Sequence, residues 1–148
     1  MLIDNEHDAH MVTHESEPAP VGGLVRLLAL LFAIWEPLGF ALVASGAFNA
    51  IRVRGIPVVI VLLARLGTTA LGVAAGRALL DRQASAPALA RAALVSSAAV
   101  QLVAYLSPWF PSNRLPGETQ LYVAWTLVYY GGWLVYLSRS KRIAALYG

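Results

Sequence analysis

The chain contains no cysteine, and only 13% of its 148 residues are charged. The absence of cysteine excludes disulfides, thiolate metal sites and cysteine nucleophiles. An ordinary soluble domain carries roughly 25% charged residues, about twice the share in this chain. Hydrophobic residues instead make up 58% of the sequence. This composition is typical of a protein that lives in a membrane.

Four long apolar runs contain most of these hydrophobic residues. They lie at about Gly23–Phe48, Ile56–Leu80, Ala88–Leu106 and Leu121–Leu137. A helix needs roughly 20 mostly apolar residues to cross the hydrocarbon core of a bilayer, and each run reaches or approaches that length. Because lipid offers no water to satisfy bare peptide groups, segments this apolar span as helices. The sequence therefore predicts an all-α fold, a bundle of four transmembrane helices over residues 21–138.

The distribution of Lys and Arg predicts how these helices are oriented, because basic residues concentrate on the cytoplasmic side. The side shared by both termini would carry seven of them: Arg26, Arg77, Arg82, Arg91, Arg139, Lys141 and Arg142. The other side would carry three: Arg52, Arg54 and Arg114. We therefore expect cytoplasmic N- and C-termini. Aromatic residues near the third joint fit a belt at the outer interface: Trp109, Phe110, Tyr122 and Trp125.

Residues 1–20 lack apolar periodicity, which predicts a disordered, acidic cytoplasmic tail. Its three histidines, His7, His10 and His14, would share one face if the tail were helical, as metal ligands sometimes do. The tail has no hydrophobic anchor and no cysteine partners. A solvated tail without metal is the favoured interpretation, and metal binding is the alternative.

At the other end, residues 139–148 predict a basic, partly amphipathic segment along the inner surface. Arg139, Lys141 and Arg142 would anchor the topology or bind anionic lipid headgroups. The net charge of +3 does not indicate nucleic-acid binding, because the basic residues lie at the ends of the apolar runs. The lipid bilayer is the expected partner.

Ionisable residues at membrane depth are costly and tend to be functional. Glu36 falls near the middle of the first run, and Arg65 falls within the second. In an antiparallel hairpin the two would differ in depth by only about 5 Å. We therefore expect a Glu36–Arg65 pair, either as a static staple or as a protonation or substrate site. Pro37 should kink the first helix, and Arg65 could also serve the carbonyl freed there.

Other polar and small residues extend this pattern. Arg65 and Thr69 share a face with Gly72 and Gly76, a small-xxx-small pattern that favours close helix packing. On the third run, a polar stripe of Ser97, Gln101 and Tyr105 should face the interior. On the fourth, Gly131 and Gly132 allow a close contact or a bend. The predicted intramembrane polar cluster is Glu36, Arg65, Thr69 and Gln101, with Tyr129 or Tyr130 as a further member.

Signatures of catalysis are missing from the sequence. It has no His-Glu-x-x-His, no Gly-x-Ser-x-Gly, no phosphate-binding glycine loop and no paired carboxylates in any run. We therefore expect neither an enzyme nor a bound cofactor.

Two short motifs resemble those of a group of small bacterial four-helix membrane proteins. The opening, Val21-Gly22-Gly23-Leu24 through Glu36-Pro37-Leu38, is similar to that group's Gly-Gly-Trp-Leu start followed by Pro-Leu. The close, Tyr136-Leu137 through Ser140-Lys141-Arg142-Ile143, is similar to its aromatic-ended last helix and Ser-Lys-Arg-Val. The group is a domain of unknown function, so the resemblance implies a fold and a bacterial inner-membrane location but no activity.

Three functions are compatible with these observations. The favoured hypothesis is a non-catalytic accessory or assembly subunit acting through a membrane-protein partner or as a homo-oligomer. The alternative is a small transporter or proton-coupled carrier that uses the polar interior around Glu36 and Arg65. An intramembrane enzyme is the least favoured. A water-accessible path to Glu36 would distinguish the carrier from the subunit, because a dry, closed bundle offers no route to a substrate.

Overall fold

The computed structural model describes residues 22–108 and 117–147, apart from the side chains of residues 49 and 142. Within these residues the fold is all-helical, with no strand. The elements are α1 (Gly23–Leu30), η1 (Leu31–Trp35), α2 (Glu36–Arg54), α3 (Ile56–Leu80), α4 (Ala86–Leu106), α5 (Glu118–Arg139) and α6 (Lys141–Tyr147). The first three form one continuous helical stretch.

The predicted apolar runs correspond to helices. α3 has the predicted bounds, and α4 and α5 extend beyond the runs that predicted them. Three stretches are long and apolar enough to cross a membrane: Gly23–Phe48, Ile56–Leu80 and Ala86–Leu106. α5 has 22 residues but is less apolar, because threonine, tyrosine and glutamine interrupt its hydrophobic residues. Among the described residues, three of the four runs are thus confirmed as helices long and apolar enough to span a membrane.

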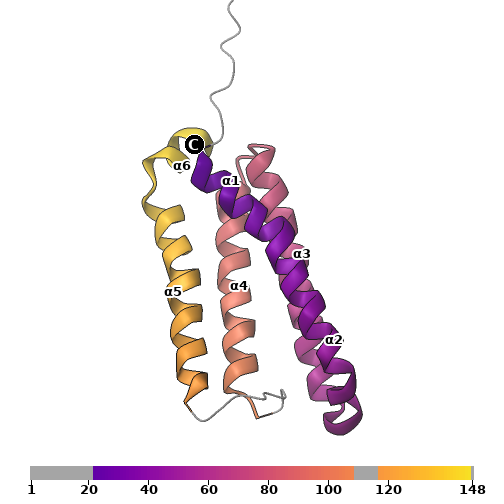
Figure 1. Cartoon of the computed structure of the whole chain (residues 1–148). Coiled ribbons are helices and arrows are strands. Elements are labelled where there is room, and N and C mark those ends of the chain that lie inside the picture. The colour runs from indigo at the N-terminus through magenta and orange to yellow at the C-terminus, as the bar shows by residue number, and fades with distance from the viewer. Residues whose placement is uncertain (1–21, 109–116, 148) are drawn as a thin grey trace, which may run out of the picture.

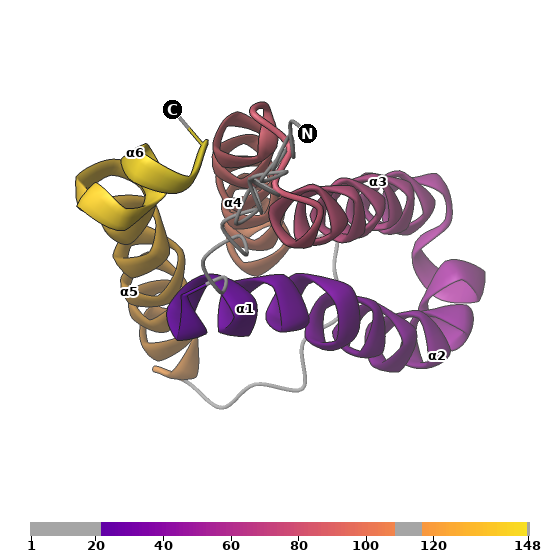
Figure 2. The same ribbon diagram turned by 90° about the horizontal axis from the view of Figure 1, so that it is seen from above.

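The long helical stretches α1–α2, α3, α4 and α5 lie roughly side by side (Figure 1). α3 packs against α4 and against the whole stretch from α1 to α2, whereas α5 packs mainly against α4. The α1–α2 stretch begins close to α6 and crosses in front of α4, so that the C-terminal end of α2 lies far from α5 (Figures 1 and 2). The helices therefore converge at the end near α6 and spread apart toward the other end.

The hydrophobic core follows this convergence. Most of its largest fully buried side chains lie in one cluster at the α6 end. They are Val25, Leu28, Leu79, Leu94 and Leu137. The guanidinium of Arg91 donates to the carbonyl of Leu137 at 3.2 Å and so ties α4 to α5 at this end. A second, much smaller cluster of Ala47, Ala50 and Val58 joins α2 to α3 at the opposite end. The middle of the molecule is left less densely filled by apolar side chains.

The first helix is irregular where Pro37 was expected to disturb it. η1 is a π-helical turn, in which the backbone N–H of Glu36 donates to the carbonyl of Leu31, five residues earlier. Pro37 follows immediately and has no N–H to continue the α-helical pattern. Such turns occur mostly as single interruptions of α-helices, frequently at functional sites. Here the interruption directly precedes the carboxylate of Glu36.

Glycines of α3 allow the first helix to approach closely. A Cβ atom on Gly76 would lie 2.9 Å from the carbonyl oxygen of Ala29 and 3.2 Å from Cβ of Phe32. A Cβ atom on Gly72 would lie 3.4 Å from Cδ1 of Phe32. The small-xxx-small pattern therefore marks the contact between α3 and the stretch α1–η1.

Gly131 and Gly132 behave differently from this expectation. A Cβ atom on either would meet nothing within 4 Å, and α5 continues as one α-helix through both positions. The close contact that these two glycines would allow is therefore not made in the described structure. The physical reason is that α5 packs mainly against α4, and no described neighbour lies close to either glycine.

The basic C-terminal segment forms the short helix α6. Ile143 is buried, Lys141 and Arg139 are exposed, and the Tyr147 hydroxyl donates to the carbonyl of Leu79 at 2.6 Å. That carbonyl belongs to the last turn of α3. α6 thus folds back over the ends of α3 and α4, with its apolar side toward the core. The side chain of Arg142 lies outside the described structure.

We expect high pH to weaken the attachment of α6. Burial raises the pKa of Tyr147 above its ordinary value of 10.0. The stabilisation from the neutral phenol is fully present below that value and is lost as the pH rises through the raised folded pKa, because the unfolded chain releases its proton first. Thermal midpoints of wild type and Tyr147→Phe in detergent, compared at neutral pH and above pH ~10, should therefore converge at high pH. A constant difference between the two would contradict this role.

Candidate ligand cavity between the helices

A cavity of about 460 Å³ lies between α2, α3, α4 and α5. Small-molecule sites in proteins typically occupy ~300–1,000 Å³, with apolar walls and a few convergent polar groups. This cavity fits that description. Its charged and amide side chains are Glu36, Arg65 and Gln101; its hydroxyls are Thr68, Thr69, Ser97, Tyr105, Thr126, Tyr129 and Tyr130; its other large side chains are Leu31, Trp35, Phe40, Val43 and Trp125.

All four members of the predicted polar cluster line this one cavity. Glu36 comes from the start of α2, Arg65 and Thr69 from α3, and Gln101 from α4. Both Tyr129 and Tyr130 of α5 join them. The polar stripe Ser97, Gln101 and Tyr105 also faces inward along its full length.

The expected Glu36–Arg65 pair is not formed. Both side chains are described, and no ion pair within 4 Å joins them; Arg65 instead donates to Oε1 of Gln101. Glu36 Oε1 accepts a hydrogen bond of 3.1 Å from the hydroxyl of Tyr130. We also expected that Arg65 could bond the backbone carbonyl freed by Pro37, but its guanidinium bonds Gln101 instead. The depth argument was sound, but side-chain direction is set by the packing of α3 on α4.

The two charged groups are therefore held by neutral partners on different helices. Arg65 of α3 bonds Gln101 of α4, and Glu36 of α2 bonds Tyr130 of α5. The Tyr130–Glu36 bond is the contact that bridges the two helices that otherwise spread apart. Each charge keeps further hydrogen-bonding capacity, because a guanidinium has five donors and a carboxylate about four acceptor sites.

Ser97 supplies an unusual feature of the cavity wall. The residue is only 5% exposed, and its Oγ has no hydrogen-bond partner in the described structure. Buried polar atoms are nearly always hydrogen-bonded, so an unpaired hydroxyl calls for a partner such as a ligand or an ordered water. Because Ser97 lines the cavity, that partner would be a molecule bound there.

The aromatic wall was the part that sequence reasoning missed. Trp125 was assigned to an interfacial belt, and Trp35 and Thr126 were not singled out at all. Thr126 and Tyr130 are four residues apart on α5, a spacing that places them on one helical face and that could have revealed them. Tyr129 and Tyr130 pack edge to face, with ring centroids 5.0 Å apart. Trp109 and Phe110 of the predicted belt lie outside the described residues.

No metal centre is found among residues 22–108 and 117–147, where no group of three or more His, Asp or Glu side chains gathers. The predicted metal alternative involved His7, His10 and His14, which lie outside these residues. The polar groups of the cavity are hydrogen-bond donors, acceptors and one charge of each sign. Such a set is suited to holding a small molecule by its polar part.

The chain matches no known protein family, no curated protein and no solved structure.

Proposed function

We propose that this protein is a small carrier of the bacterial inner membrane that binds its substrate in the cavity around Glu36, Arg65 and Gln101. In this proposal α5 is the fourth span. The π-helical turn, the polar cluster and the unpaired Ser97 hydroxyl all lie near the middle of the three apolar stretches, and carriers bind their substrates near the bilayer midplane. The single observation that carries the proposal is the cavity itself, since a subunit acting only through partners needs none.

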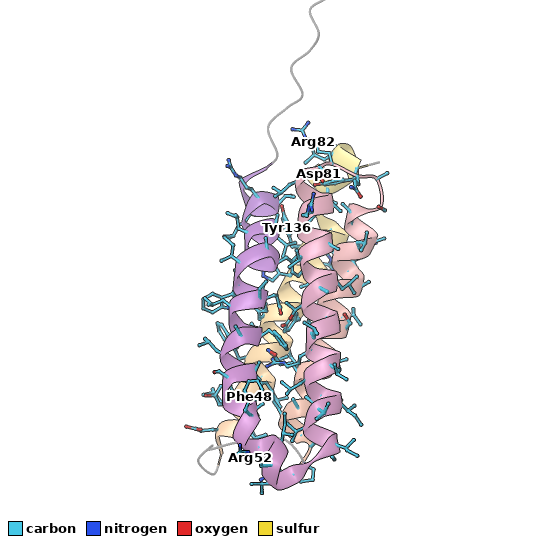
Figure 3. The ribbon with its side chains drawn as sticks, turned by 90° about the vertical axis from the view of Figure 1, so that its right-hand side faces the viewer. Phe48, Arg52, Asp81, Arg82 and Tyr136 are labelled. Atoms are coloured by element: carbon cyan, nitrogen blue, oxygen red, sulfur yellow. The ribbon has the colours of Figure 1, made fainter. Side chains whose placement is uncertain are left out.

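The distribution of charge supports cytoplasmic N- and C-termini. Arg52 lies at one end of the helices, and Asp81 and Arg82 lie at the other (Figure 3). The second end also holds Arg139 and Lys141, at the junction of α5 and α6. The richer basic end would face the cytoplasm.

The accessory-subunit hypothesis draws no comparable support from a specific feature. The exposed apolar side chains of α2, α3 and α5, such as Leu42, Leu63 and Val128, are what a lipid environment requires. They do not by themselves indicate a protein partner. Stoichiometric co-purification with a larger membrane assembly would favour the subunit over the carrier.

Accessibility of position 97 to water tests the carrier proposal. Since the chain has no cysteine, Ser97→Cys introduces a single thiol into the cavity. A charged, membrane-impermeant methanethiosulfonate reacts only with a thiolate that water reaches. We expect it to modify Ser97→Cys at least about ten-fold faster than a lipid-facing thiol on the same helix, where the thiolate is not formed.

Two matched variants complete the experiment. Val95→Cys lies two residues away on α4, is 55% exposed and faces outward, so it reports the lipid-facing rate. Ser138→Cys is exposed near the end of α5 and reports the rate in water. Modification of Ser97→Cys no faster than Val95→Cys, with Ser138→Cys reacting normally, would overturn the carrier, because the cavity would be closed to water.

A further inference from the structure

The cavity opens sideways between α2 and α5. Two of its lining residues, Trp35 beside α2 and Trp125 on α5, are 63% and 67% exposed. A residue that both lines a cavity and is largely exposed stands at its mouth. Trp35 ends η1, directly before α2, and the pair of helices that diverges in Figures 1 and 2 is α2 and α5. Both helices present further exposed apolar residues, such as Leu38 and Leu121.

In a membrane this mouth would face acyl chains. Trp35 directly precedes Glu36, which lies near the middle of the first apolar stretch. The polar wall formed by Arg65, Ser97 and Gln101 lies on α3 and α4, behind the mouth. A molecule with a polar head and an apolar tail could therefore place its head against this wall while its tail remains in lipid.

The charged side chains of the cavity indicate which kind of polar headgroup it would bind. Arg65 and Glu36 both line the cavity, yet each is bonded to a neutral partner, and they do not pair with each other. An anionic group fits beside the guanidinium, since charge-assisted hydrogen bonds are the stronger kind. An ammonium group fits beside the carboxylate and the tryptophan faces at the mouth. The unpaired Ser97 hydroxyl can donate to the anionic group.

We propose that the cavity binds the headgroup of a zwitterionic phospholipid, an ammonium joined to a phosphate, which enters from the bilayer between α2 and α5. This inference depends on the proposed function, because it names the class of molecule that the carrier would move. Arg65, Gln101 and Ser97 hold the phosphate. Glu36, with Tyr130, holds the ammonium and distinguishes this headgroup from a purely anionic one.

Headgroup selection by the purified protein tests the proposal. The full chain is reconstituted in vesicles of equal parts phosphatidylethanolamine, phosphatidylcholine and phosphatidylglycerol with identical tails. It is then extracted in mild detergent, and the retained lipid is measured by native mass spectrometry. Wild type should retain one lipid, with phosphatidylethanolamine enriched over phosphatidylglycerol by roughly ten-fold, the factor expected for one charge-assisted contact.

Four variants assign the selection to the cavity. Glu36→Gln should abolish the preference over phosphatidylglycerol, and Arg65→Gln should reduce retention of all three lipids. Ser97→Leu, which fills the head site without removing a charge, should also reduce retention and serves if a charge variant fails to fold. Arg52→Gln removes an exposed charge at the end of α2, outside the cavity, and should behave as wild type.

Retention of the three lipids in equal amounts, unchanged by Glu36→Gln or Ser97→Leu, would overturn the proposal, because the bound lipid would then be annular only. Rapid modification of Ser97→Cys together with no selected lipid would leave the carrier intact with a water-soluble substrate. Selected lipid together with an unreactive Ser97→Cys would instead support the lipid site and overturn the water-accessible carrier. Failure of the lipid-site proposal can thus be distinguished from failure of the carrier proposal.

Discussion

Gly76→Ala is expected to destabilise the fold, although alanine is the better helix former. The new Cβ would lie 2.9 Å from the carbonyl oxygen of Ala29, a backbone atom that cannot move without shifting α1 away from α3. Overpacking of this kind costs roughly 1–3 kcal/mol. The gain in helix propensity from replacing glycine, up to about 1 kcal/mol, offsets only part of that cost.

Gly67→Ala is the matched control. It lies on the same helix, and its Cβ would meet nothing within 4 Å, so only the propensity gain applies. Unfolding of both variants in mixed micelles, followed by circular dichroism, should place Gly76→Ala below wild type and Gly67→Ala at or above it. Equal stability of the two variants would show that α1 and α3 are not in the close contact described here.

Gln101→Leu is expected to have the second large effect, because among the described residues Gln101 is the one side-chain acceptor that the Arg65 guanidinium bonds. A charged guanidinium left without its acceptor inside the bundle lowers the stability of the fold more than a neutral donor would. Hydrogen bonds to charged groups contribute about 1.5–3 kcal/mol. Removing the charge as well, in Arg65→Met with Gln101→Leu, should recover most of the loss. Replacing both members of a buried polar pair by apolar groups is often nearly neutral.

Gln83→Leu is the control for this cycle, since it makes the same chemical change at an exposed position between α3 and α4. It should leave the free energy of unfolding close to that of wild type. The pair would be disproved by a double variant whose loss equals the sum of the two single losses, because independent sites add.

The helices themselves were predictable because a span is a local property. The bounds of α3 follow from its apolar composition, from Gly55 and Pro57 at its start and from Asp81 at its end. Gly55 adopts a positive φ of 67°, which glycine accepts without strain, and so allows α2 to end and α3 to begin within one residue. α5 was harder to place, because its polar residues reduce its mean hydropathy.

Some of the residues that line the cavity were also predictable, because their signal is local to one segment of the sequence. Glu36, Arg65, Thr69 and Gln101 are conspicuous because polar groups in apolar runs are costly and must face one another. The aromatic residues Trp35 and Trp125 carry no such signal. An aromatic side chain on an apolar helix can face lipid as readily as it can line a cavity. Only the separation of α2 from α5 places Trp35 and Trp125 at the mouth of the cavity.

Composition and periodicity along single segments were enough to predict the helical elements, their approximate ends and the polar residues that share the interior. The tertiary structure was needed to show that Arg65 bonds Gln101 and that Glu36 bonds Tyr130. It also decided that the glycines of α3 are packed while Gly131 and Gly132 are not. These outcomes depend on the rotation and separation of whole helices, which the composition of a single segment does not specify.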